Sequence, residues 1–240
     1  MRTLALSVLL LLGLALSSLR VAAQALDAEP AFGLPLVTFA MDWRSEPPRW
    51  YSISIDSSGR TSYQSEPAIY PGETAGDPFL MKFTSSQPTR DEIFRLAREL
   101  QYFKQGNYEV TSDSSQATTM TLRWQDALPR EYGFMSSDQD NQKTYNRSND
   151  PRVNELTSIF ERISATMEAG RRLNDSLPSN SAGIEGALAR MKELQSNDQL
   201  LELQALQPLL QSVADSPTVS APARARVREL LSAAETVAAK

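Results

Sequence analysis

The sequence contains neither cysteine nor histidine among its 240 residues. Without cysteine, a disulfide framework, a lipid-anchored N-terminal cysteine, a thiolate nucleophile and a Cys-ligated metal are all excluded. Without histidine, the commonest general base, the Ser-His-Asp triad and the imidazole ligands of catalytic zinc are excluded as well. A chain of this length buries a core without cross-links, so these absences restrict chemistry and leave folding unaffected.

The N-terminal residues have the organisation of a secretory signal peptide. Arg2 precedes an unbroken apolar run over residues 4–16, and small residues follow it. This pattern predicts export to a bacterial periplasm or exterior, with cleavage after Ala23 and a second candidate cut after Ala25. A bilayer requires roughly 20 apolar residues. This run is shorter and no later run is long enough, so we expect no membrane span.

The remaining chain is acidic. Removal of Arg2 and Arg20 leaves 24 − 2 = 22 basic residues against 29 acidic ones, a net charge of −7. Nucleic acids and anionic lipids attract surfaces rich in Lys and Arg. We therefore expect no nucleic-acid partner.

Aromatic residues mark a boundary in the chain. Phe, Trp and Tyr occur from Phe32 to Phe160, and the following 80 residues contain none. The first part mixes β-branched and aromatic residues with turn formers, whereas the second has the composition of short amphipathic helices. We predict a signal peptide at 1–23, an α+β domain at 24–175 and a helical tail at 176–240.

The stretch 50–65, WYSISIDSSGRTSYQS, predicts a β-hairpin. Apolar and polar residues alternate before the turn, which is typical of a strand with one buried face. A type I turn with a bulge, and Gly59 at positive φ, would place Ile53 opposite Thr61 and Tyr51 opposite Tyr63. The serines of DSSG are then turn residues and not a binding loop.

The same periodicities predict the other elements of the α+β domain, an antiparallel sheet with two helices on one face. A capping box of Thr89 and Glu92 begins one helix, and Asp150 caps the other. The strands are predicted at 36–43, 79–84, 118–125 and 132–134, and the helices at 90–104 and 151–173.

The tail shows three helical patterns, at 184–195, 200–214 and 221–239. Pro208 should kink or split the second of them. Part of this tail is similar to a single HEAT-type helix pair. Because a pair cannot bury itself alone, we expect the tail to dock on the first domain or on a partner.

Several candidate sites have a simpler structural explanation. The acidic pairs Asp91/Glu92 and Asp126/Glu131 resemble the two carboxylates of a glycosidase, but helix-start electrostatics and turn solvation account for them. The sequence from Asp138 begins like a calcium loop, yet Lys143 and Asn149 replace its glycine and its final glutamate. We predict no catalytic residue, no metal and no cofactor.

The aromatic residues Trp43, Trp50, Tyr51, Tyr70 and Tyr108 offer a platform for carbohydrate or peptide, or else fill the core. Trp50 is the exception to core packing, because it follows Pro47-Pro48-Arg49 and lies on the opposite face from Ile53. It is therefore the candidate surface contact.

The order of hairpin, loop, helix and strand over residues 48–170 resembles uncharacterised exported bacterial domains of the emfourin-like kind. The matching positions are Tyr51, Ile53, Ile55, Gly59, Tyr63, Phe94, Leu96, Leu100 and Phe103. The resemblance implies a fold. Members of that family are associated with metalloprotease inhibition, but no inhibitory segment is matched here.

Export and the missing catalytic groups together favour a non-enzymatic binding or interaction module whose partner is an unknown protein or envelope component. Two alternatives stay open: a secreted protease inhibitor acting through residues 64–78 or 136–149, and a carboxylate-dependent secreted hydrolase that needs two acids in one cleft. Ligand, partner and oligomeric state are not encoded in any motif.

Overall fold

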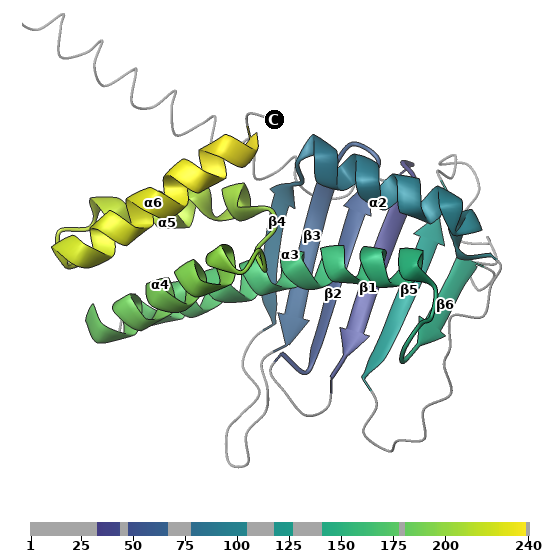
Figure 1. The fold of residues 1–240 in the computed structure, drawn as a ribbon, viewed down its shortest axis with the longest axis horizontal. Helices are drawn as coiled ribbons and strands as arrows, with labels where there is room; N and C mark the ends of the chain where they lie inside the picture. Colours follow the sequence, from purple (N-terminus) through teal and green to yellow (C-terminus); the bar gives the residue numbers. More distant parts are fainter. Residues whose placement is uncertain are drawn as a thin grey trace, which may run out of the picture.

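The computed structural model describes residues 33–43, 48–66, 78–104, 118–126, 141–177 and 181–238. It is an α+β fold, as predicted: an antiparallel sheet carries helices on one face, and a helical part follows at the C-terminus (Figure 1). The predicted signal peptide and the strand predicted at 132–134 lie outside the described residues.

The sheet has six strands in the order β4-β3-β2-β1-β5-β6, and every neighbouring pair is antiparallel. The strands predicted within the described residues are all present. Strand β6 was not predicted, because four residues with one buried side chain give too little periodicity to detect. The bounds are β1 Leu36–Asp42, β2 Trp50–Asp56, β3 Arg60–Glu66, β4 Phe79–Thr84, β5 Thr119–Gln125 and β6 Gln142–Tyr145.

The two faces of the sheet differ in polarity. Successive side chains of a strand point to opposite sides of the sheet. On the side covered by the helices, Phe39, Ile53 and Tyr63 are fully buried. The other face carries small polar residues, and the hydroxyls of Thr38 and Ser54 lie 3.0 Å apart on it. Each strand therefore contributes one apolar side to a single core.

The predicted turn of the β2–β3 hairpin is confirmed, but its predicted register is wrong. Gly59 has a φ of +91° and its N–H donates to the Asp56 carbonyl at 2.9 Å, as in a type I turn with a bulge. Ile55 pairs with Thr61 and Ile53 pairs with Tyr63, so each β2 residue lies opposite a β3 residue two positions later than predicted. A shift of two residues keeps every side chain on its predicted face.

Helix α2, Gln87–Glu99, begins three residues before the predicted start. Ser86 is the N-cap residue and Pro88 occupies the first turn, where a missing N–H costs nothing. The predicted capping box is wrong, since Glu92 pairs with Arg95 instead of the helix start.

The predicted apolar stripe of this helix is buried throughout, at Ile93, Leu96, Ala97, Leu100 and Phe103. The helix itself ends earlier than predicted, and the short 3-10 turn η1, Gln101–Phe103, follows with positive φ at all three residues. This turn carries Phe103 into the core without a further helical turn.

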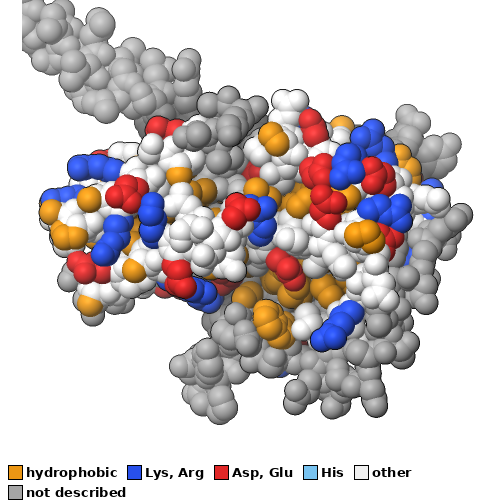
Figure 2. Space-filling view, in the orientation of Figure 1, with side chains coloured by type: hydrophobic (Ala, Val, Ile, Leu, Met, Phe, Trp, Pro, Cys, Tyr) orange, Lys and Arg blue, Asp and Glu red, His pale blue; other side chains and the backbone are white. Residues whose placement is uncertain are grey.

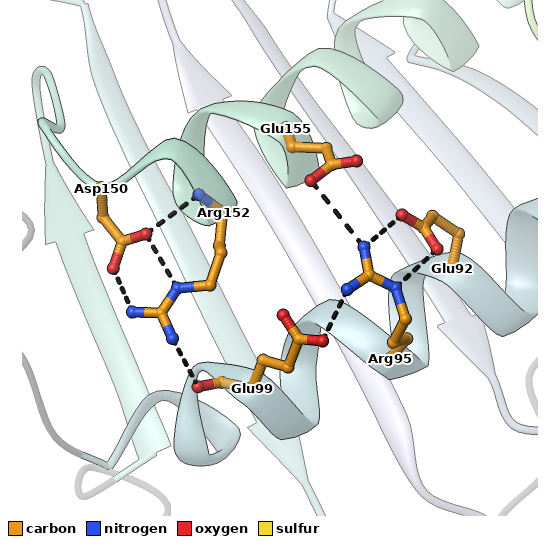
Figure 3. Close-up of polar contacts among 6 residues, drawn as sticks. All are labelled: Glu92, Arg95, Glu99, Asp150, Arg152 and Glu155. Atoms are coloured by element: carbon orange, nitrogen blue, oxygen red, sulfur yellow. Dashed lines mark hydrogen bonds and ion pairs between the residues drawn. The ribbon is translucent and has the colours of Figure 1, made fainter.

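Helix α3, Pro151–Ser176, lies beside α2 across the strands (Figure 1). Asp150 caps it as predicted, because its carboxylate accepts from the Arg152 N–H at 2.9 Å. At the solvent side, Arg95 of α2 lies 2.6 Å from Glu99 and 3.8 Å from Glu155 of α3 (Figure 3). These groups are all well exposed, so the ion pairs orient the two helices more than they stabilise them.

The tail folds into α4 Ser181–Ser196, η3 Leu203–Leu206, α5 Gln207–Asp215 and α6 Ala221–Ala238. Pro208 lies in the first turn of α5, directly after the 3-10 turn, and the predicted split of the second helical pattern is confirmed. No described helix is long and apolar enough to cross a bilayer.

The tail packs on the sheet domain through α3, which contributes to both cores. Residues up to Met167 belong to the sheet core, and Ala169 and Leu173 belong to the tail core. Two hydrogen bonds reinforce this contact: Glu202 accepts from the Ser86 N–H at 2.7 Å, and Thr166 accepts from the Leu201 N–H at 2.9 Å.

Candidate functional site: a cleft beside helices α3 and α4

A cleft of about 460 Å³ opens where the ends of β1 and β2 meet α3 and α4. Figure 2 shows hydrophobic side chains at the surface below α3, on this face of the molecule. The apolar lining is Met41, Trp43, Pro48, Ala165, Ala169, Ala187 and Leu194. The polar lining is Tyr51, Glu161, Ser164, Glu168, Arg172 and Arg190.

The floor of the cleft is part of a row of residues that crosses the sheet. Ser65, Tyr51, Met41, Met120 and Tyr145 are consecutive cross-strand partners on β3, β2, β1, β5 and β6. Trp43 continues the inward face of β1 one residue past the strand, and its N–H donates to the Arg49 carbonyl at 2.6 Å. This hydrogen bond extends the pairing of β1 and β2 to Trp43, whose side chain lines the cleft.

Helix α3 forms the long wall of the cleft. Glu161, Ala165, Glu168 and Arg172 follow one another at spacings of three or four residues, which places them on one stripe of the helix. The core stripe of Val153, Leu156, Phe160, Ile163 and Met167 is adjacent to it. The cleft wall is thus a second, polar stripe of the same helix.

Glu168 is buried and fully engaged. Its Oε1 accepts from the Tyr63 hydroxyl at 2.8 Å and from the Ser65 hydroxyl at 2.6 Å. Its Oε2 accepts from Arg171 at 2.7 and 2.9 Å. Burial, together with the Glu168 charge, raises the pKa of Tyr63. Glu168 therefore joins α3 to β3 and leaves little of its carboxylate for a ligand.

Glu161 has the opposite environment. Its side chain reaches solvent, and no hydrogen bond or ion pair to it occurs among the described residues. Desolvation raises the pKa of its carboxyl. Burial and then the Glu161 charge raise the pKa of Tyr51, and both residues line the cleft.

Two guanidinium groups also line the cleft. Arg172 is exposed and makes no ion pair within the described part of the chain. Arg190 of α4 pairs with Glu193 at 2.7 Å, but both side chains are more than half exposed, so this pair is weak. The lining therefore includes one carboxylate without an ion pair among the described residues, Glu161, and one such guanidinium, Arg172, eleven positions further along α3.

A second hollow of about 450 Å³ adjoins the first at Glu161, which lines both. Met120 and Tyr145 form its floor, and its rim is the polar segment 146–149. The two hollows follow α3 across the sheet.

Of the aromatic residues considered from the sequence, the structure brings Trp43 and Tyr51 together in the cleft. Trp50 is half-buried between Asp42 and Glu66 on the opposite face of the sheet, away from the cleft. Tyr70 and Tyr108 lie outside the described residues. The prediction of Trp50 as a surface contact stays a prediction.

The acidic pairs are accounted for locally. The Arg90 guanidinium lowers the pKa of Asp91, and the Arg95 guanidinium lowers that of Glu92. Asp126 accepts from the Trp124 indole N–H at 2.7 Å, and Glu131 is outside the described residues.

The calcium-like segment and the two inhibitor segments are described only in part. Lys143 belongs to β6, and residues 64–66 belong to β3, so these portions are paired in the sheet. Within the described ranges, no group of three metal-ligating side chains comes together.

Sequence reasoning missed Glu161 and Arg172. The available signal is the pattern of small and charged residues at 161, 165, 168, 169 and 172, which runs beside the apolar stripe of the same helix. From the sequence alone, such a pattern indicates a solvent-exposed helix face, because nothing in it shows that a second element lies opposite.

Comparison of the sequence with protein-family profiles and with curated proteins finds no match.

Proposed function

We propose that this protein is an exported, non-enzymatic binding module that takes its ligand in the cleft beside α3 and α4. The observation that carries this proposal is the combination of apolar walls with charged groups that lack internal partners. Glu161 and Arg172 are exposed at the cleft and have no ion pair among the described residues, so a charged ligand group can bind them without breaking an existing pair.

The dimensions support the same conclusion. Ligand sites in proteins enclose roughly 300–1,000 Å³, are lined mainly by apolar side chains and contain a few placed polar groups. The cleft of about 460 Å³ meets each of these conditions. Its position between the sheet and the helical tail is also one where sites commonly occur, because two packed units meet there.

Blocking the cleft tests the proposal. Tryptophan at Ala165 fills the cleft, whereas tryptophan at Ala225, exposed on α6, is a matched control. Binding of pentapeptides, medium-chain carboxylates and medium-chain amines is measured by isothermal titration calorimetry, and folding is checked by circular dichroism. We expect one class to bind both wild type and Ala225→Trp, and to bind folded Ala165→Trp at least about tenfold more weakly. Equal binding to all three proteins, or no binding, would overturn the proposal.

A carboxylate-dependent hydrolase is the second candidate, because Glu161 and Glu168 line one cleft and the pKa of Glu161 is raised. Glycosidases require such a pair, with one carboxyl protonated. The seven-residue separation corresponds to about 10.5 Å of helix rise, above the range of roughly 6.5–9.5 Å between the carboxyl groups of inverting enzymes. The donors that already occupy both oxygens of Glu168 make it a poor nucleophile or base, which is why binding ranks first.

Turnover of chromogenic glycosides and peptides distinguishes the two candidates. A hydrolase would lose turnover in both Glu161→Gln and Glu168→Gln. The binding proposal expects no turnover by wild type under conditions where ligand binds.

A further inference from the structure

We propose that the ligand is a short linear peptide with free ends, its amino group at Glu161 and its carboxylate at Arg172. This inference rests on the proposed function and specifies the ligand of the same cleft.

The charges of the cleft are the first argument. Glu161 makes no ion pair among the described residues, and the neighbouring Arg162 pairs with Asp198 instead, although desolvation penalises the Glu161 charge. A ligand ammonium would supply that missing charge through a charge-assisted hydrogen bond. Arg172 likewise has no carboxylate partner within the described ranges, and guanidinium groups bind carboxylates through two parallel hydrogen bonds.

A second helix adds another cation to the cleft lining. Arg190 lines the same cleft from α4, and its exposed pair with Glu193 costs little to rearrange. The lining therefore offers two guanidinium groups, from different helices, to an anionic ligand. A single carboxylate at the end of a chain suits this arrangement.

The separation of the two ends sets the ligand length. Eleven residues of α3 separate Glu161 from Arg172, which corresponds to about 16 Å of helix rise. An extended peptide covers about 3.3–3.6 Å per residue, so about five residues span this distance. A small metabolite with both charges on neighbouring atoms would reach only one end.

The walls between the ends suit peptide side chains. Ala165, Ala169 and Ala187 are small and leave room beside α3 and α4, while Trp43 and Leu194 offer apolar contact area. Aromatic and aliphatic walls of this kind stabilise apolar side chains without demanding a single sequence.

The test uses the full-length protein and three forms of one pentapeptide of alternating alanine and leucine: free-ended, N-acetylated and C-amidated. Acetylation removes the ammonium and amidation removes the carboxylate. Affinities are measured by calorimetry with wild type, with Glu161→Gln and with Arg172→Gln. The matched controls are Glu66→Gln on β3 and Arg228→Gln on α6, both exposed and outside the cleft lining.

For wild type and both controls, we expect acetylation and amidation each to weaken binding by about tenfold, the usual value of one charged hydrogen bond. Glu161→Gln should bind the free and acetylated forms equally, and Arg172→Gln should bind the free and amidated forms equally. This crossed pattern assigns each peptide end to one residue.

Three results would overturn the inference. Equal binding of all three forms, with Ala165→Trp still blocking it, would leave a binding cleft that ignores peptide ends. Binding of medium-chain carboxylates or amines without peptides would identify a ligand with one charge. Loss of binding in the control variants to the same extent as in Glu161→Gln would show a general charge effect.

Discussion

Glu161 and Glu168 lie two helical turns apart on α3, line the same cleft, and differ in what surrounds them. Donors from β3 and from Arg171 surround the buried Glu168, whereas Glu161 has no such donors within the described ranges. One carboxylate therefore holds the fold together, and the other is available to a ligand.

Replacing Glu168 by glutamine should destabilise the protein by about 3 kcal/mol. The substitution removes a charge from buried donors and turns an amide N–H₂ toward them, and both effects are costly. Glu161→Gln is the matched control on the same helix and should not reduce stability. Urea denaturation measures both, and equal effects of the two variants would contradict the assignment of roles.

The pH dependence of stability should also identify Glu161. Its pKa is raised in the folded state, so the unfolded chain, with a carboxyl pKa of about 4.3, releases the proton first as pH rises. Glu161 consequently reduces stability above that range. We expect Glu161→Gln to match wild type at about pH 3 and to exceed it at about pH 7 in urea denaturation. Greater stability of wild type at neutral pH would show that the folded state favours the charged carboxyl.

At the scale of elements, α3 is the part that sequence reasoning described well but incompletely. Its cap, its start and its core stripe followed from Asp150, Pro151 and the apolar spacing, because these are local signals. The contact of α3 with the tail could not be predicted from the sequence. Gly170 permits a close approach there, but no local signal indicates that Leu206 is the residue packed against it. The hairpin register was likewise wrong, because alternation fixes the face of a strand and not its partner.

Alanine at Gly170 should destabilise the packing of the tail. Its Cβ would lie 2.5 Å from Cδ2 of Leu206, which is fully buried and has little room to move. We expect a net loss of about 1 kcal/mol in thermal or urea unfolding, after the gain in helix propensity is included.

Gly186 on α4 provides the control. A Cβ there meets nothing within 4 Å, so Gly186→Ala should stabilise the protein by about 0.5–1 kcal/mol. If both variants shift stability in the same direction, the close approach of α3 and η3 is not as described.

At the scale of the whole molecule, the candidate site arises from the junction of its two parts. The sequence predicted an α+β domain and a helical tail, and the fold class is confirmed. The cleft was not predictable from either part, because Trp43 and Tyr51 come from the sheet, Glu161 and Arg172 from α3, and Arg190 from α4. No local pattern brings residues from these three places together.

The three tryptophans provide the most direct measurement of the central claim. Trp43 lines the cleft, Trp50 lies on the opposite face of the sheet, and Trp124 packs in the core against Phe94. Their indole N–H signals are followed by NMR while the free-ended pentapeptide is added. The account predicts that the Trp43 signal shifts in a saturable manner and that the Trp50 and Trp124 signals stay in place. A shift confined to Trp50, or no shift at saturating binding, would contradict it.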